Sequence, residues 1–294
     1  MTSNFEDGQY PSGYNQSDFL QVGSNGPRLN INKNQTNKTS LESNSINVTI
    51  PKIIMQTWKD HNLPDHWKNS PDSFKKHMPG WKYEFMTDED IIKFIKEKDP
   101  KYLDVYNSFE YTIQKIDFFR ILWLYHYGGI YSDMDFELQR PLDDLFTSNA
   151  DLYVVQSGNV GHVITNSFIA AKPKSPILKE YLDEMGEEYR WWAFGKHLKV
   201  MTSTGPLAFS RVLKYTSHVY SILPKTLMMP CSACDSVCDP GPEAYLKATK
   251  GCSWIGWDTK MYNFFNCNWK LVIAVIVGLI ILLIAYFVIR WCVG

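Results

Sequence analysis

The chain has 294 residues, a formal net charge of -1 and an aromatic content of 15%. Its nearly balanced charges give no basic surface of the kind that binds nucleic acid. Six cysteines in a chain of this length do not make a disulfide-dense scaffold, and the length suffices for one sizeable domain with appendages.

Residues 1–49 form a polar N-terminal segment that is rich in Asn, Ser, Thr, Gln and Gly and has no apolar periodicity. Such a segment cannot bury enough surface to offset the entropy of ordering the chain, so we expect a disordered arm. The segment contains no apolar stretch typical of a secretory signal peptide.

The following part of the chain alternates between two hydrophobic patterns. The strand pattern occurs at residues 49–58, 82–86, 130–132, 152–156, 164–171 and 199–202. The helix pattern occurs at residues 89–98, 111–127, 176–189 and 206–215. This alternation predicts an α/β domain with a mostly parallel sheet, over residues 50–266. Ligands of such sheets bind beyond the carboxyl ends of the strands, where Trp58 and Asp133 both fall.

An Asp-x-Asp triplet follows the predicted strand at 130–132. The helix predicted for 111–127 ends at a Gly-Gly pair, because glycine adopts positive φ without a steric penalty. If the backbone then stays extended, Asp133 and Asp135 point to the same side. Paired carboxylates suit Mg²⁺ or Mn²⁺ and leave positions for water and substrate phosphates. The alternative is that one of them caps the turn before Arg140.

Residues 271–289 are nineteen consecutive uncharged residues between Lys270 and Arg290. As a helix they would extend about 28 Å, close to the thickness of the hydrocarbon core of a bilayer. Trp269 lies where interfacial aromatic residues are found. We therefore expect a C-terminal transmembrane helix, within an anchor and short tail at 267–294.

The predicted orientation of this single-pass protein rests on few charges. Lysines on the domain side of the span outnumber Arg290 beyond it, which favours a cytosolic domain under the positive-inside rule. A Golgi- or ER-type membrane or another internal membrane is expected, and the side that the domain faces stays open.

The cysteines allow three states. Cys231, Cys234 and Cys238 are closely spaced, and Cys252 and Cys267 follow. The first four could bind Zn²⁺ tetrahedrally as thiolates. Disulfides are the second possibility, if the domain faces an oxidising lumen, and free thiols are the third.

Several blocks of the chain, in one order, resemble the Asp-x-Asp glycosyltransferases of family 32. These blocks are residues 50–59, 79–83 with 87–90, 116–135, 166–171, 204–206 and 253–254. The resemblance spans roughly residues 50–258. It implies a GT-A-type nucleotide-sugar-binding domain, a UDP- or GDP-linked donor, a divalent metal (Mn²⁺ or Mg²⁺) and sugar transfer with retention. The acceptor would be a lipid or a glycan.

The resemblance also implies roles for particular residues. Asp133 and Asp135 resemble the pair that holds the metal and the donor. Asp117 and Arg120 resemble a catalytic pair that binds the hydroxyls of the donor sugar, and their spacing of three puts them on one helix face. The alternative for the second pair is a surface salt bridge.

Further residues resemble the donor site. Trp58 resembles the aromatic residue that stacks on the nucleotide base, with Gln56 and Thr57 as polar neighbours. The alternative is a core tryptophan that closes the first strand. The remaining residues assigned to the donor site are Tyr131, Asn166, Gly205, Ser253 and Trp254.

Two positions depart from the family pattern. Met55 stands where members commonly have His, and residues 247–252 lack the His that many carry there. The second departure puts contacts to metal and phosphate in doubt. The alternative function is therefore a catalytically inactive, membrane-tethered protein that binds a nucleotide sugar or a glycan.

Overall fold

A computed structural model describes residues 20–22, 49–146, 148–157, 163–185, 193–231, 234–235, 239–249, 251 and 253–293. Most of the predicted N-terminal arm, and its expected disorder, therefore lies outside the described residues. Within the arm, Leu20–Val22 forms strand β1 and pairs antiparallel with β8 (Val219–Leu223). These three residues differ from the expectation of an arm without regular structure.

A seven-stranded sheet organises the domain, in the order β1-β8-β6-β7-β4-β2-β3. Its other strands are β2 (Ile53–Thr57), β3 (Lys82–Met86), β4 (Gly129–Ser132), β6 (Leu152–Ser157) and β7 (Val163–Ala171). Five strands point the same way, and only β7 and β1 run opposite to their neighbours. The predicted α/β domain with a mostly parallel sheet is confirmed. A two-stranded sheet pairs β5 (Phe136–Leu138) with β9 (Leu246–Ala248).

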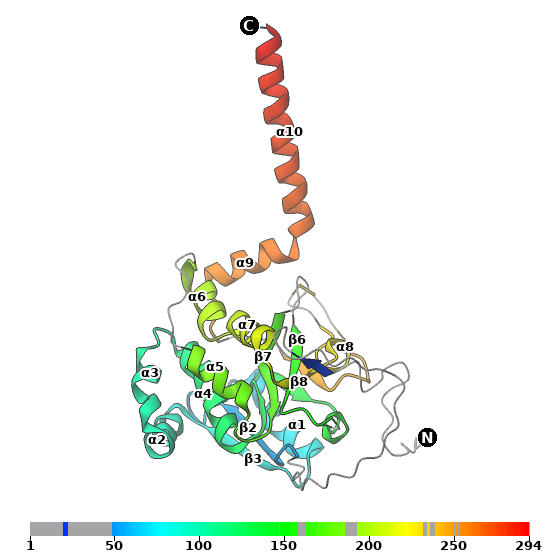
Figure 1. Cartoon of the computed structure of the whole chain (residues 1–294). Helices are drawn as coiled ribbons and strands as arrows, with labels where there is room; N and C mark the ends of the chain where they lie inside the picture. The colour runs from blue at the N-terminus through cyan, green and yellow to red at the C-terminus, as the bar shows by residue number, and fades with distance from the viewer. Residues whose placement is uncertain are drawn as a thin grey trace, which may run out of the picture.

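Helices cover both faces of the large sheet (Figure 1). The helices of the described chain are α1 (Asn69–His77), α2 (Asp88–Lys98), α3 (Leu103–Ser108), α4 (Thr112–Tyr127), α5 (Pro176–Glu184), α6 (Gly195–Ser203), α7 (Pro206–Tyr215), α8 (Lys225–Met228), α9 (Trp257–Cys267) and α10 (Trp269–Val293), of which α10 extends away from the sheet. Alternate strand residues enter different cores. Met55 and Tyr131 pack with α4, α5 and α7, whereas Ile54 and Ile130 pack with α1 and the small sheet. This alternation follows from side chains pointing to opposite faces of a strand.

The turn between α4 and β4 requires its two glycines. Gly128 and Gly129 have φ of 66° and 88°, in the region that favours glycine. A Cβ on Gly129 would lie 2.4 Å from the carbonyl oxygen of Ile53, because β4 approaches β2 closely there. The glycine pair therefore ends α4 and sets β4 beside β2, which places the residues after Ser132 at the carboxyl edge of the sheet.

Two predicted elements differ from the structure. The strand predicted at 199–202 is part of helix α6, in which His197, Val200 and Ser203 are buried. This spacing of three is helical, so packing against neighbouring helices outweighs the β-branched residues in the segment. The helix predicted over 176–189 ends at Glu184, and residues 186–192 lie outside the described part of the chain.

Helix α10 extends away from the domain at the C-terminal end (Figure 1). It has 25 residues and contains the predicted span at 271–289. Among the described residues, it is the one helix long and apolar enough to cross a membrane, and its apolar window is 0% buried. Length and composition therefore agree with the predicted anchor.

Candidate functional site

Asp133 and Asp135 lie just beyond β4, on the wall of a cavity of about 440 Å³. Several segments bring predicted residues to the same wall: Thr57 and Trp58 follow from β2, and Ser253 and Trp254 precede α9. The rest of the lining was not predicted and consists of Lys59, Trp67, Asp88, Glu110, Tyr111, Thr112, Ile113, Ile116, Met134 and Lys196. Six of the predicted residues therefore meet at one cavity.

Asp133 is held by hydrogen bonds from beneath the cavity. The Tyr131 hydroxyl donates to Asp133 Oδ1 at 2.5 Å, and Arg120 Nη1 lies 3.0 Å from the same oxygen. The backbone N–H of Asp133 donates to the carbonyl of Ser167 at 2.8 Å. Burial raises the pKa of Asp133, and the Arg120 guanidinium opposes that rise. The side chain remains 30% exposed. The Oδ1 atom of Asp133 is thus held by Tyr131 and Arg120, while the carboxylate lines the cavity.

Arg120 and Asp117 form a buried pair on α4. Their atoms Nη2 and Oδ1 lie 3.1 Å apart, and the side chains are only 3% and 4% exposed, so the surface salt bridge alternative is wrong. Arg120 Nη1 also donates to the carbonyl of Asn166 at 2.8 Å. The Asn166 amide and the Thr204 hydroxyl donate to Asp117 at 2.9 Å and 3.0 Å.

This network lies behind the cavity rather than on its wall. Arg120, Asp117 and Asn166 are all buried and are not among the lining residues. Burial raises the pKa of Asp117 to about 7, although Arg120 lowers it. Arg120 contacts both Asp133 and Asp117, and neither member of the predicted catalytic pair lines the cavity in this structure.

Asp135 differs from Asp133 in having an unpartnered oxygen. Its Oδ1 atom is buried and accepts no hydrogen bond from the described residues. Its backbone carbonyl accepts from the N–H and the hydroxyl of Thr249, at 2.8 Å and 3.0 Å. Burial, and then the charge of Asp133, raise the pKa of Asp135 to about 7. A buried, unsatisfied carboxylate oxygen beside a second carboxylate fits a hard divalent cation.

Gln56 lies under the aspartates and does not line the cavity. Its amide nitrogen donates to the carbonyl of Asp133 at 3.1 Å and to the Ser70 hydroxyl at 2.9 Å. The amide oxygen accepts from the Tyr83 hydroxyl at 2.7 Å. This predicted donor-site residue therefore supports the backbone of the Asp-x-Asp loop.

Gly205 also lies behind the cavity. It is the N-cap of α7, and its carbonyl accepts a hydrogen bond from the Tyr181 hydroxyl at 3.1 Å. A Cβ there would lie 3.0 Å from the carbonyl oxygen of Val200 in α6. Glycine at this position permits the close approach of α6 and α7.

Trp58 and Trp67 form an aromatic corner of the cavity. Their rings meet edge to face with centroids 4.8 Å apart, and both rings line the cavity. Trp58 is only half-buried, whereas a core tryptophan that closes the first strand would be fully buried. Both indole N–H groups are buried without a hydrogen-bond partner in the described part of the chain. Trp67 ends a short turn at Asp65–Trp67 and belongs to no sequence pattern that could have identified it.

Trp254 is held by His197 of α6. The two rings are stacked, with centroids 5.4 Å apart and planes 8° apart. The backbone N–H of His197 donates to Asp258 of α9 at 2.7 Å, and its Nδ1 atom lies 3.1 Å from the Thr259 hydroxyl. The wall formed by Trp254 is thus connected to α6 and α9 together.

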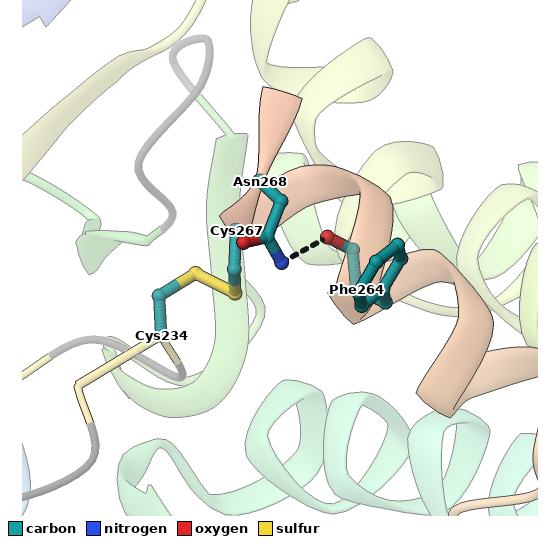
Figure 2. The surroundings of a disulfide bond; sticks show 4 residues. All are labelled: Cys234, Phe264, Cys267 and Asn268. Atoms are coloured by element: carbon teal, nitrogen blue, oxygen red, sulfur yellow. Dashed lines mark hydrogen bonds between the residues drawn. A yellow bond between two sulfur atoms is a disulfide. The ribbon is translucent and has the colours of Figure 1, made fainter. Parts of the chain in front are cut away.

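The cysteines form disulfides. Cys234 is bonded to Cys267 at the end of α9, as Figure 2 shows, and Cys231 is also in a disulfide. A sulfur in a disulfide is not a thiolate ligand, so the zinc alternative is wrong for Cys231 and Cys234. Cys238 and Cys252 lie outside the described residues. Cys292 is free and exposed.

Together, the α/β domain and the acidic loop beyond β4 place two carboxylates on a mixed polar and aromatic cavity at the carboxyl edge of the sheet, where α/β domains bind ligands. A family model described as "Glycosyltransferase sugar-binding region containing DXD motif" matches residues 64–151, which include Asp133-Met134-Asp135. Inositol phosphoceramide mannosyltransferase 1 of Schizosaccharomyces pombe is 34% identical over 232 residues, which cover 76% of this chain and 68% of that protein. The chain belongs to this family of DXD glycosyltransferases, glycosyltransferase family 32.

Other similarities are shorter. Mannosyl phosphorylinositol ceramide synthase SUR1 of Saccharomyces cerevisiae is 34% identical over 165 residues, which are 56% of this chain but only 42% of that protein. Among solved structures, the PaToxG Glycosyltransferase aligns with a TM-score of 0.42 at 20% identity, covering 56% of this chain and 69% of that chain. A score of this size does not establish a common fold.

Proposed function

We propose that this glycosyltransferase is a metal-dependent, retaining enzyme of GT-A type that transfers mannose from a nucleotide sugar to a membrane lipid. The observation that carries the proposal is the unpartnered oxygen of Asp135 beside Asp133, on the wall of the cavity. The names of the relatives supply the sugar and the acceptor, since they are mannosyltransferases of inositol phosphoceramide.

Asp135 and Asp133 would hold the divalent cation, which when bound supplies positive charge next to the departing nucleoside diphosphate. Arg120 and Tyr131 hold Asp133 on one oxygen, so that its carboxylate keeps its orientation toward the cavity. Trp58 offers an aromatic face for the nucleotide base. Ser253 and Trp254 also line the cavity.

We assign none of the carboxylates on the cavity wall as a covalent nucleophile. Retention would then follow from attack of the acceptor hydroxyl on the same face from which the diphosphate leaves, with the leaving phosphate accepting the proton of that hydroxyl. Mass-spectrometric detection of a trapped glycosyl-enzyme adduct would contradict this mechanism.

The structure shows where the two departures from the family pattern lie, which are Met55 and the absence of His from residues 247–252. Met55 is fully buried in the core on the side of α4, so a side chain at this position does not reach the cavity. The absence of His from 247–252 has a counterpart nearby: a Cβ on Gly251 would lie 2.7 Å from Nε2 of His66. An imidazole from another segment therefore stands beside this loop, although His66 is not among the residues that line the cavity.

We also propose that α10 anchors the enzyme in an internal membrane and that the domain faces the lumen. The disulfide between Cys234 and Cys267 supports this orientation, because disulfides persist in oxidising compartments. It opposes the cytosolic side that the lysine count favours.

The test uses the full chain in lipid nanodiscs with Mn²⁺, inositol phosphoceramide and a panel of UDP- and GDP-sugars. Release of nucleoside diphosphate is followed for the native protein, for Asp135→Asn, and for Asp104→Asn, which changes an exposed aspartate of α3. We expect turnover of GDP-mannose that is lost on chelation and in Asp135→Asn but retained in Asp104→Asn. Donor binding that depends on Mn²⁺ without turnover of any sugar would instead support the inactive binding protein.

A further inference from the structure

Helix α9 exposes an apolar face to solvent. Trp257, Met261, Phe264 and Phe265 are 75%, 50%, 57% and 48% exposed. Their spacing of three, four and eight residues places them on one side of the helix. In a helix that covers a soluble domain, the apolar side faces the core, so α9 has the reverse arrangement.

The inner side of α9 is held to the domain by polar contacts. Asp258 accepts the backbone N–H of His197 at 2.7 Å, and the Thr259 hydroxyl lies 3.1 Å from His197 Nδ1. The Tyr262 ring packs on the same imidazole with centroids 4.6 Å apart. These contacts fix the rotation of α9 about its axis, so the apolar side cannot turn inward.

The chain itself indicates what covers this face. Only Asn268 separates α9 from α10, and its side-chain amide donates to the carbonyl of Phe264 at 2.8 Å (Figure 2). Helix α9 runs crosswise to α10 at the base of the extended helix (Figure 1). If α10 spans a bilayer, α9 lies at the depth where the bilayer meets water.

A covalent bond secures the same junction. Cys267, the last residue of α9, is bonded to Cys234 in the loop that follows α8. Lys260 and Lys270 lie on α9 and at the start of α10, and both are exposed. Basic and aromatic side chains around an apolar face are typical of helices that lie in a membrane interface.

We propose that α9 is an interfacial helix whose apolar face inserts into the lipid surface and seats the catalytic domain on the bilayer. This inference rests on the proposed function only in taking α10 as a membrane anchor. Because His197 joins α9 to Trp254, the cavity wall and the lipid-contacting helix move together. The cavity is thereby held close to acceptor head groups that project from the bilayer.

The first test measures lipid contact without using activity. A fluorophore sensitive to polarity is attached to Met261→Cys or to Ile92→Cys in full chains that carry Cys292→Ser, in phosphatidylcholine nanodiscs. Ile92 is a matched control, since it is also exposed but lies on α2. We expect the probe at 261 to emit at shorter wavelength and to be quenched several-fold more by nitroxide-labelled phosphatidylcholine than the probe at 92.

Equal quenching at the two positions would overturn the proposal. A shift to shorter wavelength at 261 without nitroxide quenching would also overturn it, because a second copy of the chain would then cover α9.

A second test uses Met261→Glu with Phe264→Glu, which changes two exposed side chains. We expect several-fold slower transfer to a lipid in nanodiscs and an unchanged rate of Mn²⁺-dependent donor hydrolysis, with Ile92→Glu unaffected in both. Equal rates of lipid transfer in all three proteins would contradict the seating role. Absence of donor turnover in every protein would count against the proposed function, while the quenching result still decides on α9.

Discussion

The Nη1 atom of Arg120 lies 3.0 Å from Oδ1 of Asp133, and Nη2 of the same guanidinium lies 3.1 Å from Oδ1 of Asp117. One buried cation thus stands between two carboxylates, of which only Asp133 reaches the cavity. The orientation of a residue on the cavity wall is therefore set in part by a buried side chain of α4.

Replacement of Arg120 should destabilise the whole domain. Arg120→Met leaves Asp117 and Asp133 without their cation in a buried site, a change that costs about 3–5 kcal/mol in comparable pairs. Arg120→Lys keeps the charge but not the two-pronged geometry, so its melting temperature should fall between those of Arg120→Met and the native protein.

The control for this series is Lys179→Met, which removes an exposed ion pair with Asp183 on α5 and should cost about 0.5 kcal/mol or less. Thermal unfolding of the full chain in one detergent compares the four proteins. Equal melting temperatures for Arg120→Met and Lys179→Met would show that the buried pair is not formed.

Tyr131→Phe should weaken metal binding without unfolding the protein. The change removes the hydroxyl that donates to Asp133 at 2.5 Å and leaves the ring beside Arg120 in place. Loss of a partner that orients a metal ligand lowers metal affinity by about 10- to 100-fold. Titration of Mn²⁺ measures the effect, and Tyr245→Phe is the control because its hydroxyl donates to Asp144 instead. If Tyr131→Phe binds Mn²⁺ with native affinity, the Tyr131 hydroxyl does not orient Asp133 for metal binding.

Gly129→Ala should prevent the close approach of β4 and β2. Its Cβ would lie 2.4 Å from the carbonyl oxygen of Ile53, at a φ of 88°. Gly80→Ala is a matched control, because Gly80 has a φ of 86° but no atom within 4 Å of the added carbon. The control should cost about 1–2 kcal/mol from backbone strain alone. Gly129→Ala should lower the melting temperature by much more, and equal shifts would contradict the steric argument.

Strands and helices could be predicted from the sequence where a clear local feature marks their ends. The strand at Lys82–Met86 and the helix at Pro206–Tyr215 have the predicted bounds, since a turn or a proline marks their ends. Helix α1 was missed, although Phe74 and Met78 are four residues apart and buried, because its Asn, Ser, Pro and Asp residues have low helix propensity. Helix α9 was also missed, although Trp257, Met261, Phe264 and Phe265 recur at helical spacings.

The sequence predicts several residues of the candidate site, but it does not predict which of them line the cavity and which lie behind it. Sequence patterns identify Asp133 and Trp58, which follow strand ends, and both line the cavity. They do not distinguish a residue on the wall from one behind it, so they do not predict that Arg120 and Gln56 lie outside the lining of the cavity. Trp67 comes from an irregular segment, and only tertiary packing places it beside Trp58.

The disulfide between Cys234 and Cys267 should stabilise the junction with the anchor. Closing a loop with a sequence separation of 33 corresponds to about 3–4 kcal/mol in the chain-entropy model. Cys234→Ser should therefore lower the melting temperature, whereas Cys292→Ser, which changes a free and exposed thiol, should not. Peptide mapping without reductant checks the pairing. Alkylation of Cys234 in the native protein before reduction would contradict it.

His197 should make the stability of the domain depend on pH. Burial lowers the pKa of this imidazole from its ordinary value of 6.5, although Asp258 opposes the effect. On acidification the unfolded chain therefore binds a proton before the folded chain does. The stability that comes from a neutral His197 is complete above the unfolded pKa and is lost as the pH falls toward the folded pKa.

His197→Asn removes this titration. The advantage of the native protein over the variant in melting temperature should shrink between about pH 7.5 and about pH 5.5. Asp117 and Asp135, whose pKa values are raised, titrate in both proteins and cancel in the comparison. If the advantage over His197→Asn stays constant or grows on acidification, His197 is not held neutral between α6 and α9, and Trp254 loses the support inferred for it.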